Sequence, residues 1–410
     1  MGEHKSDTAK QLTIQYALIQ ACFWAGYMGI RGFTTVYLSE RGFSYSLIGL
    51  VVALASGLSV ILQTLLGNLS DRKPQIPIRF FTAGLLIAAM LTAAFLIVFP
   101  YNIIPVTFLV YVTMNTIMTA TQPFVTSQAY DYINRGLHIN FGLARGMGSI
   151  SAGLSTAIVG KLVQRLGPDC IMPILIGAYT IDLALVLTFT RKHGIPAKAV
   201  PKKTDAVPAG VMEFFRQNRR FTLFLVGSCL LLFSYQCINT YLINIAKAAG
   251  GDSSTVGFEL AIAAVCELLP MSTYHYLARR YGCERMLRVS CIFFLLKTVG
   301  MLLAFRVPVI YLAALMQVGG FGLYFPASAD FANRAVRPAD RVKGQALLSA
   351  ASVGLATMAG SLIGGVIIDF LGIRVLMSIC LVVCACGAVI TWRATRPSGK
   401  CDVNRGVLYD

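Results

Sequence analysis

Long apolar stretches alternate with short polar segments along the whole chain. About twelve of these stretches have about 20 residues, the length of a helix that crosses the hydrocarbon core of a bilayer. Within lipid each backbone amide must find its partner inside its own segment, so the stretches predict helices. The predicted spans cover residues 12–38, 46–66, 78–99, 103–131, 141–164, 170–190, 221–246, 255–277, 286–305, 308–332, 344–370 and 374–394.

Six spans precede and six follow one basic segment, which predicts an all-α membrane protein of twelve transmembrane helices in two six-helix halves. The expected organisation is an N-terminal half at 1–190, a basic linker at 191–220, a C-terminal half at 221–394 and a tail at 395–410. The composition agrees, since 56% of the residues are hydrophobic and 13% are charged. A soluble domain needs more polar residues to cover its helices. No cleavage site follows the first apolar run, so we expect a span there rather than a signal peptide.

The net charge of +17 is distributed unevenly between the predicted loops. Lys and Arg concentrate on the side that holds both termini and the linker. The opposite loops carry only Arg41, Lys161, Arg165, Lys247, Arg306 and Arg374. By the positive-inside rule, both termini and the linker are expected in the cytoplasm, with the chain in the cell membrane. No basic domain outside the spans is long enough to bind nucleic acid, so no such partner is expected.

Residues that serve enzymes and metal centres do not occur at the spacings those sites need. The eleven cysteines lie mostly inside spans and form no CxxC pair, so we expect them to be packing residues. No nucleophile has a nearby base, and the sequence has no P-loop. The four histidines, which lie outside the polar helix faces, are His4, His138, His193 and His275. We therefore expect neither an enzyme nor a primary pump, and neither a metal nor a cofactor.

The two halves share a local pattern. The fourth span ends in Asp131-Tyr-Ile-Asn134-Arg135, and the tenth ends in Asp330-Phe-Ala-Asn333-Arg334. The span that follows each of them is rich in glycine, which lets helices cross closely in lipid. Internal duplication of this kind is typical of transporters.

One loop motif and several segments resemble a known family. Gly67-Asn-Leu69-Ser-Asp71-Arg72 resembles the cytoplasmic loop motif of the Major Facilitator Superfamily, and within it the chain is similar to the lactose permease and oligosaccharide:proton symporter branch. The similar segments are Met28-Gly29, Phe141-Gly142-Leu143-Ala144-Arg145, Glu213-Phe214-Phe215-Arg216-Gln217, Glu267-Leu268-Leu269 and Lys297-Thr298-Val299-Gly300. The resemblance implies a secondary active transporter, functional as a monomer, that moves a small solute together with protons by alternating access.

Glu267 and Lys297 lie near the middles of the eighth and ninth spans, where a charge needs a partner or a cavity. We expect them to pair, and a static interior salt bridge is the alternative to a functional role. The resemblance implies a role in coupling, because Glu267 falls at the essential sugar-binding and coupling glutamate of the lactose permease family. Lys297 falls at an arginine tied to proton coupling.

The chain departs from that family at other site positions. Gln317 stands at the coupling histidine, Gly320 at the coupling carboxylate, Thr126 or Ser127 at an acid of the fourth span, and Ala152 at the tryptophan that stacks on galactose. A galactoside is therefore not the expected substrate. Glu267 is the best remaining candidate for the carboxylate that couples proton movement.

The first span carries a polar stripe on one helix face. Gln20, Trp24, Tyr27 and Arg31 recur at i, i+4, i+7 and i+11, which suits a water-filled cavity better than lipid. Arg31 reaching to the outer interface is the alternative. Polar faces also occur in the second, fourth and seventh spans, and they contain Ser56, Ser59, Gln63, Asn115, Thr119, Gln122, Thr126, Tyr235, Gln236 and Asn239.

The predicted cavity has an excess of positive charge. Arg145 lies where the family's matching arginine contacts substrate, but it lacks the usual acidic partner, and an unpaired arginine prefers a carboxylate. We therefore expect a small organic anion, such as an aromatic carboxylate. Uptake of a sugar, oligosaccharide or nucleoside, efflux of a drug or metabolite by antiport, and a non-transporting sensor are the alternatives. The predicted substrate-binding residues are Gln20, Trp24, Tyr27, Arg31, Asn115, Thr119, Gln122, Arg145, Tyr235, Gln236, Asn239, Lys297 and Gln317.

A second set of residues lies at the predicted cytoplasmic ends of the spans. Its acid-to-basic spacings resemble the contacts that close the cytoplasmic gate in the superfamily, so we predict a gate there. The set contains Gly67, Asp71, Arg72, Asp131, Asp330 and Arg337. Asp182 and Glu259 also lie at or near membrane depth, and the sequence assigns neither of them a role.

Overall fold

The computed structural model describes residues 2–73, 75–99, 103–133, 139, 141–189, 211–337 and 340–396, and the regular structure in these ranges is helical. The long helices of the first part are α1 (Gly2–Arg31), α3 (Tyr45–Arg72), α4 (Ile78–Val98), α5 (Ile104–Ile133), α6 (Phe141–Leu166) and α7 (Ile171–Thr188). Those of the second part are α9 (Arg219–Thr240), α11 (Ser253–Tyr281), α12 (Cys283–Leu302), α14 (Phe321–Ala335), α16 (Ala356–Leu371) and α17 (Ile373–Ala394). Short helices are α2 (Thr34–Ser39), η1 (Pro168–Cys170), α8 (Val211–Gln217), α10 (Leu242–Ala248), α13 (Val307–Leu315), η2 (Met316–Val318), α15 (Arg341–Ser349) and the π-helix η4 (Ala350–Leu355).

Four predicted spans are interrupted where the sequence predicts one continuous helix. The first breaks between α1 and α2 at Gly32, and the seventh breaks between α9 and α10 at Tyr241. The tenth consists of α13, the 3₁₀ turn η2 and α14, with Gly319 and Gly320 at the break. The eleventh contains the π-helix η4. Hydropathy cannot detect these breaks, because the residues that carry them are as apolar as their neighbours or are small.

Ten helical segments in the described ranges are long and apolar enough to cross a membrane. α1 and α12, with 30 and 20 residues, are not among them. α12 carries Glu284, Arg285, Arg288 and Lys297, which lower its hydropathy. The predicted linker 191–220 includes α8 and the start of α9, and residues 190–210 and 397–410 lie outside the described ranges.

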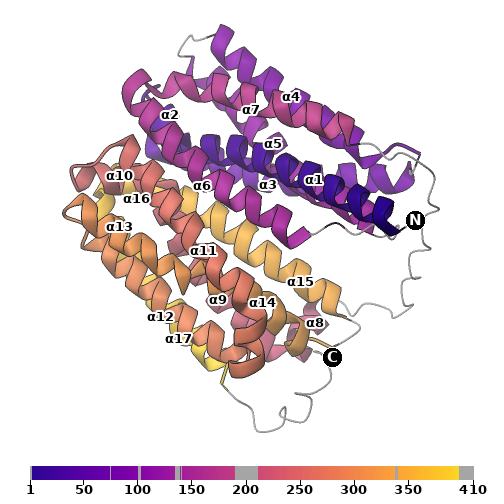
Figure 1. Ribbon diagram of the computed structural model, residues 1–410. Helices are drawn as coiled ribbons and strands as arrows, with labels where there is room; N and C mark the ends of the chain where they lie inside the picture. Colours follow the sequence, from indigo (N-terminus) through magenta and orange to yellow (C-terminus); the bar gives the residue numbers. More distant parts are fainter. Residues whose placement is uncertain are drawn as a thin grey trace.

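The helices lie in two groups, the first group (α1–α7, indigo to magenta) and the second group (α8–α17, rose to yellow), as Figure 1 shows. We call the end at which α1 begins and α8 lies the terminal end, and the end with α2 and α10 the opposite end (Figure 1). Between the groups, α6 packs along α11 and α3 packs along α16. These two helix pairs form the contact between the groups.

Glycines let these helix pairs approach closely near the opposite end. On α3, a Cβ at Gly49 would collide with the backbone carbonyl of Ser361 on α16. Between α6 and α11, a Cβ at Gly160 would lie 2.7 Å from the Ser253 carbonyl oxygen. Towards the terminal end, Gly67 and Gly146 have open space beside them. In the described part of the chain, the close glycine contacts between the groups therefore lie towards the opposite end.

The apolar core divides in the same way. One buried cluster runs through the first group and continues into residues of the second group near the opposite end, such as Tyr241 and Ile368. A separate cluster around Phe224 and Phe331 fills the second group near the terminal end. The buried apolar surface thus joins the two groups at the opposite end, where the structure is closed.

Candidate functional site

A buried polar network connects four helices of the second group. Lys297 on α12 is 3% exposed, and its Nζ lies 3.2 Å from Oε1 of Glu259 on α11, which is 0% exposed. The same ammonium donates a hydrogen bond of 2.9 Å to Oε1 of Gln317 in η2. The ion pair that Lys297 makes is therefore with Glu259, and the direct pair that we expected with Glu267 is wrong.

Gln317 connects Lys297 to Glu267. Its amide nitrogen donates to Oε1 of Glu267 at 2.5 Å and to the hydroxyl of Tyr235 on α9 at 2.9 Å. The amide oxygen thus faces a cation and the amide nitrogen faces a carboxylate. The reversed orientation would place the amide nitrogen beside the Lys297 ammonium and the amide oxygen beside the Glu267 carboxylate, so the network fixes the orientation of this side chain. Glu267 is half-buried, unlike Glu259, and is the outermost carboxylate of the network.

A second polar set lies on α1, as the stripe in the sequence predicts. Gln20 donates to the Tyr16 hydroxyl at 2.6 Å and accepts a hydrogen bond of 2.9 Å from Nε1 of Trp24. The guanidinium of Arg145 on α6 lies 4.2 Å from the centroid of the Trp24 ring, close enough for a cation–π interaction. Gly148 lies beside Trp24, and a Cβ there would come within 2.8 Å of the indole.

Arg145 faces the second group. Its Nη1 donates to the Ser149 hydroxyl at 3.1 Å, and no ion pair within the described ranges includes it. Its charge and that of Glu267, on the neighbouring helix α11, are close enough to influence each other. The structure therefore brings the predicted arginine of one group and the predicted glutamate of the other to the same region.

The other predicted binding residues of α1 and α5 occupy the stretch toward the opposite end. Arg31 is half-buried, and its Nη1 donates to the Tyr27 hydroxyl at 3.3 Å. The hydroxyls of Tyr27 and Thr119 lie 3.5 Å apart. The Asn115 side chain donates a hydrogen bond of 3.2 Å to the backbone carbonyl of Tyr111 within its own helix. The remaining predicted residues, which are half-buried, are Gln122, Gln236 and Asn239.

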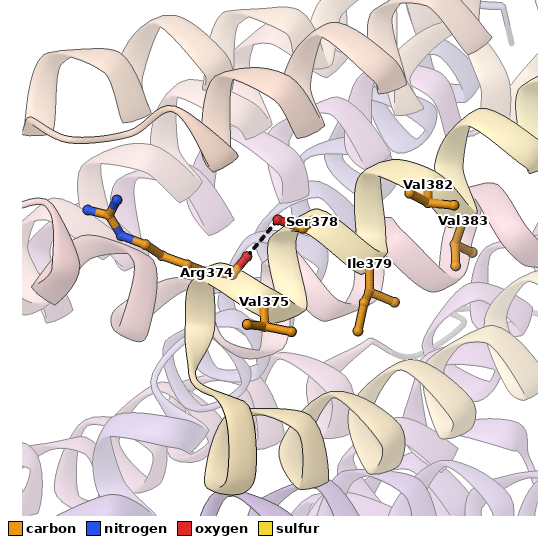
Figure 2. A pocket seen from close by; sticks show the side chains of 6 residues that line it. All are labelled: Arg374, Val375, Ser378, Ile379, Val382 and Val383. Carbon is orange, nitrogen blue, oxygen red and sulfur yellow. Dashed lines mark hydrogen bonds between the residues drawn. The ribbon is translucent and has the colours of Figure 1, made fainter.

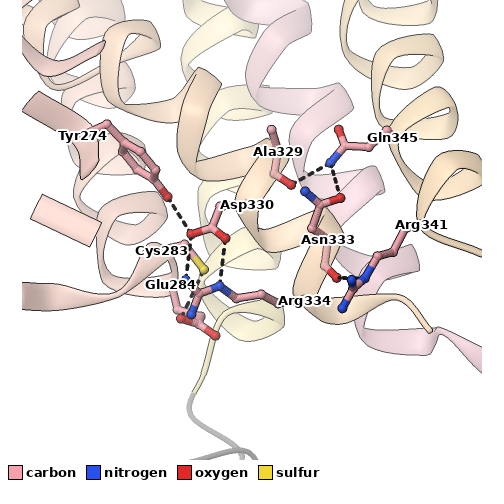
Figure 3. Close-up of polar contacts among 9 residues, drawn as sticks. All are labelled: Tyr274, Cys283, Glu284, Ala329, Asp330, Asn333, Arg334, Arg341 and Gln345. Carbon is pink, nitrogen blue, oxygen red and sulfur yellow. Dashed lines mark hydrogen bonds and ion pairs between the residues drawn. The ribbon is translucent and has the colours of Figure 1, made fainter. Parts of the chain in front are cut away.

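Asp330, a predicted gate residue of the second group, lies near the last turn of α14, and Figure 3 shows its contacts. Asp330 forms an ion pair with Arg334 at 2.8 Å and accepts a 3.0 Å hydrogen bond from the Tyr274 hydroxyl. The acid therefore pairs with the basic residue four positions on, whereas Arg337, the basic member of the predicted gate set in this group, is exposed. Gly67 and Arg72 lie at the terminal end of α3, and the side chains of Asp71 and Asp131 lie outside the described part of the structure.

Further contacts join α14 to its neighbour α15 in the same region. Gln345 donates to the carbonyl of Ala329 at 2.7 Å and to the side-chain oxygen of Asn333 at 2.9 Å (Figure 3). Arg341 donates to the backbone carbonyl of Asn333 at 3.1 Å. These bonds hold two helices of the second group to each other.

A depression of about 420 Å³ lies on α17, and none of the residues that line it belongs to either polar set (Figure 2). Its lining is mostly aliphatic, and the Ser378 hydroxyl donates to the carbonyl of Arg374 inside the same helix at 3.1 Å. The guanidinium of Arg374 lies over the Phe305 ring. An apolar surface of this kind on a membrane helix suits lipid chains better than a polar solute.

Glu259 is the functional candidate that the sequence interpretation left without a role. The available signal was its position about two turns before Glu267 on a span next to the one that carries Lys297. Side-chain direction decides which acid meets the lysine, and the sequence alone does not give it. No group of three or more His, Cys, Asp or Glu side chains suitable for a metal occurs in the described ranges.

Comparison with known proteins agrees with this architecture. The chain is 23% identical to a maltose permease of Geobacillus stearothermophilus over 376 residues, 89% of this chain and 91% of that one. It is 23% identical to a probable 3-phenylpropionic acid transporter of Escherichia coli (strain K12) over 343 residues, 83% of this chain and 87% of that one. The crystal structure of the nucleoside transporter NupG has the same fold, with a TM-score of 0.73, 18% identity and coverage of 93% of this chain and 98% of that one. Residues 14–378 match the model of the MFS_1-like family, and the chain therefore belongs to this family of Major Facilitator Superfamily transporters.

Proposed function

We propose that the protein is a proton-coupled secondary active transporter with twelve transmembrane spans in two six-helix halves. The ten apolar segments supply ten spans, and α1 and α12 supply the other two. Gln20 and Trp24 of α1 and Lys297 of α12 belong to the two polar sets, so each of these helices carries polar side chains in its interior turns. The halves are residues 1–190 and 221–394, joined by the linker 191–220 and followed by the tail 395–410.

The proposed transport cycle is alternating access. The two groups are in close contact towards the opposite end through the α3–α16 and α6–α11 pairs, whereas Gly67 and Gly146, towards the terminal end, have open space beside them. The positive-inside rule places the terminal end in the cytoplasm. In this assignment the structure is an inward-open state, and transport requires the contacts at the opposite end to break.

The proposed substrate is a small organic anion with an apolar or aromatic body. The observation that carries this proposal is Arg145, which lies over the Trp24 ring without an acidic partner at ion-pair distance in the described ranges. A guanidinium can bind a carboxylate through two parallel hydrogen bonds, and Trp24 offers an apolar surface beside it. The similarity to a probable 3-phenylpropionic acid transporter supports the same class.

Charge balance supports coupling of this anion to a proton. Glu259, Glu267, Lys297 and Arg145 carry two negative and two positive formal charges, so this part of the site is neutral, and Arg31 lies apart from it beside Tyr27. An arriving anion adds a negative charge to a region of low dielectric constant, which costs free energy. A proton bound by a carboxylate of the network restores neutrality, and Glu267 is the carboxylate whose charge acts on Arg145.

A neutral, hydroxyl-rich solute is the second candidate. Glu267, Gln317 and Tyr235 present acceptors and donors that could bind hydroxyl groups, and the maltose permease and nucleoside transporter are relatives of this kind. In this alternative, Arg145 and Glu267 act on each other only through their charges in the empty protein, and the solute binds between them.

Uptake into liposomes tests the proposal. The purified protein is reconstituted and supplied with radiolabelled 3-phenylpropionate, maltose or uridine under an inwardly directed proton gradient. We expect concentrative uptake of 3-phenylpropionate that a protonophore abolishes. Uptake of maltose or uridine alone would replace the anion proposal with the second candidate, and loss of preloaded solute against the same gradient would indicate antiport. Absence of gradient-driven movement of all three would contradict proton-coupled transport of these classes.

A further inference from the structure

The two carboxylates of the network differ in what stabilises their negative charge. Glu267 accepts a hydrogen bond from Gln317, is stabilised by the charge of Arg145 and is half-buried. Glu259 is 0% exposed, neither of its oxygens accepts a hydrogen bond, and its contact with an opposite charge is the Lys297 ammonium at 3.2 Å. The ionised form of Glu259 therefore depends on Lys297 far more than the ionised form of Glu267 does.

The Lys297 ammonium contacts two side chains, one on each side of it. It lies between Glu259 on one side and the amide oxygen of Gln317 on the other, and Gln317 connects it to Glu267. The Lys297 ammonium also lies 5.5 Å from the centroid of the Tyr235 ring. The charged and titratable groups around Glu259 are therefore Lys297 on α12, Tyr235 on α9 and Glu267 on its own helix, with Arg145 of α6 beyond Glu267.

Glu259 cannot contact a solute in this conformation, because its side chain has no exposed surface. Any role in transport must act through Lys297. If an anion near Glu267 and Gln317 draws the Lys297 ammonium toward itself, Glu259 loses the charge that stabilises it. A buried carboxylate without a counter-charge takes up a proton, because the free energy of burying it ionised is too high.

We propose that Glu259 is a second coupling carboxylate, which holds Lys297 by an ion pair when ionised and releases it toward Gln317 and the substrate side when it binds a proton. The proposal rests on the proposed function and assigns a residue to its coupling step. In the step, one proton from water adds to a carboxylate oxygen of Glu259, the Glu259–Lys297 ion pair breaks, and Lys297 stays protonated. Since Glu259 has no exposed surface here, the proton enters in a conformation with different packing around it.

Two modes of transport by the reconstituted full chain test this inference, with radiolabelled 3-phenylpropionate as the probe and maltose as the second probe. Gradient-driven accumulation needs proton coupling, whereas exchange at equal pH needs only binding and reorientation of the loaded protein. Glu259→Gln should lower accumulation at least tenfold and leave exchange within about threefold of wild type. Asp182→Asn is the matched control, because Asp182 is also a fully buried acid of a membrane helix, and it should accumulate like wild type.

Glu259→Gln leaves Lys297 buried without its partner, so a second variant guards against misfolding. Glu259→Gln/Lys297→Gln removes both charges. It should exchange without accumulating if Glu259 couples the proton. Accumulation at the wild-type level by this variant would overturn the proposal, since a purely structural ion pair is replaceable in this way. If wild type itself accumulates neither probe, the proposed function fails first, and the following measurement still decides the role of Glu259.

Infrared difference spectra of the reconstituted protein, recorded between acid and neutral pH with protons as the sole probe, report protonation directly. A component of the carboxylic C=O stretching band should titrate in wild type, disappear in Glu259→Gln and persist in both Glu267→Gln and Asp182→Asn. A band that is unchanged in Glu259→Gln, or the absence of any titrating component, would overturn the assignment.

Discussion

The carboxylate of Asp369 on α16 accepts a 2.7 Å hydrogen bond from the backbone N–H of Ser46 in the first turn of α3. It also accepts from the backbone N–H of Tyr45 at 3.0 Å and from the Ser46 hydroxyl. The first N–H groups of a helix have no partner within it and carry a partial positive charge, so an acid there is favoured. Because α3 and α16 belong to different groups, this contact holds the opposite end closed.

Replacing Asp369 should shift the protein toward a state that is open at the opposite end. Charge-assisted hydrogen bonds contribute about 1.5–3 kcal/mol, so Asp369→Ala should change the ratio of the two states by about tenfold or more. Spin labels at the exposed positions 40 and 371 would report a longer distance between the groups. Asp169→Ala is the matched control, because Asp169 pairs with Arg41 inside the first group. Equal distance distributions in wild type and Asp369→Ala would show that this contact does not hold the gate.

A methyl group at Gly49 should prevent α3 and α16 from closing. Its Cβ would collide with the Ser361 backbone, which cannot rotate away as a side chain could. We therefore expect Gly49→Ala to lower both the midpoint of thermal unfolding and the rate of uptake. Gly84→Ala on α4 is the control, because nothing lies within 4 Å of that Cβ. There the better helix propensity of alanine should add about 0.5–1 kcal/mol of stability. Equal behaviour of the two variants would refute the tight contact at Gly49.

The orientation of the chain in the membrane follows from the distribution of Lys and Arg. A cysteine introduced at Lys247 near the opposite end should react with a membrane-impermeant maleimide added outside intact cells. A cysteine at Lys73, at the terminal end, should react only after the membrane is permeabilised. Both sites are exposed, and a background without the native cysteines serves as the control. The reverse pattern would invert the orientation and turn the inward-open assignment into an outward-open one.

The sequence predicts the fold well because lipid imposes the pattern that hydropathy detects. Span positions follow from apolar length, and the shared helix face of Gln20 and Trp24 follows from helical periodicity. In the structure these two side chains form a hydrogen bond with each other. The breaks at Gly32 and at Gly319 escaped prediction, because they depend on packing against neighbouring helices.

The partner of Lys297 escaped prediction for a different reason. Three polar side chains on adjacent spans were in reach of it, and the choice among them depends on helix rotation and on the 3₁₀ turn that places Gln317 beside the lysine. A family resemblance pointed to Glu267, since that position carries the coupling glutamate in the lactose permease family. The structure places Glu259 at the ammonium instead and leaves Glu267 one hydrogen-bonded residue away.

The charge selectivity of the site should depend on Arg145 and Arg31. Replacing either with Gln removes a charge-assisted hydrogen bond to a substrate carboxylate, worth about 1.5–3 kcal/mol, so affinity for the anion should fall about ten- to one-hundredfold. The loss should be much smaller for the corresponding amide, because a neutral group gains less from a guanidinium. Calorimetric binding of 3-phenylpropionate and of 3-phenylpropionamide to wild type, Arg145→Gln and Arg31→Gln separates these cases. Arg41→Gln is the control, since Arg41 pairs with Asp169 at the opposite end. An equal loss for acid and amide would mean that these arginines support the structure, and it would favour a neutral solute that binds between Arg145 and Glu267.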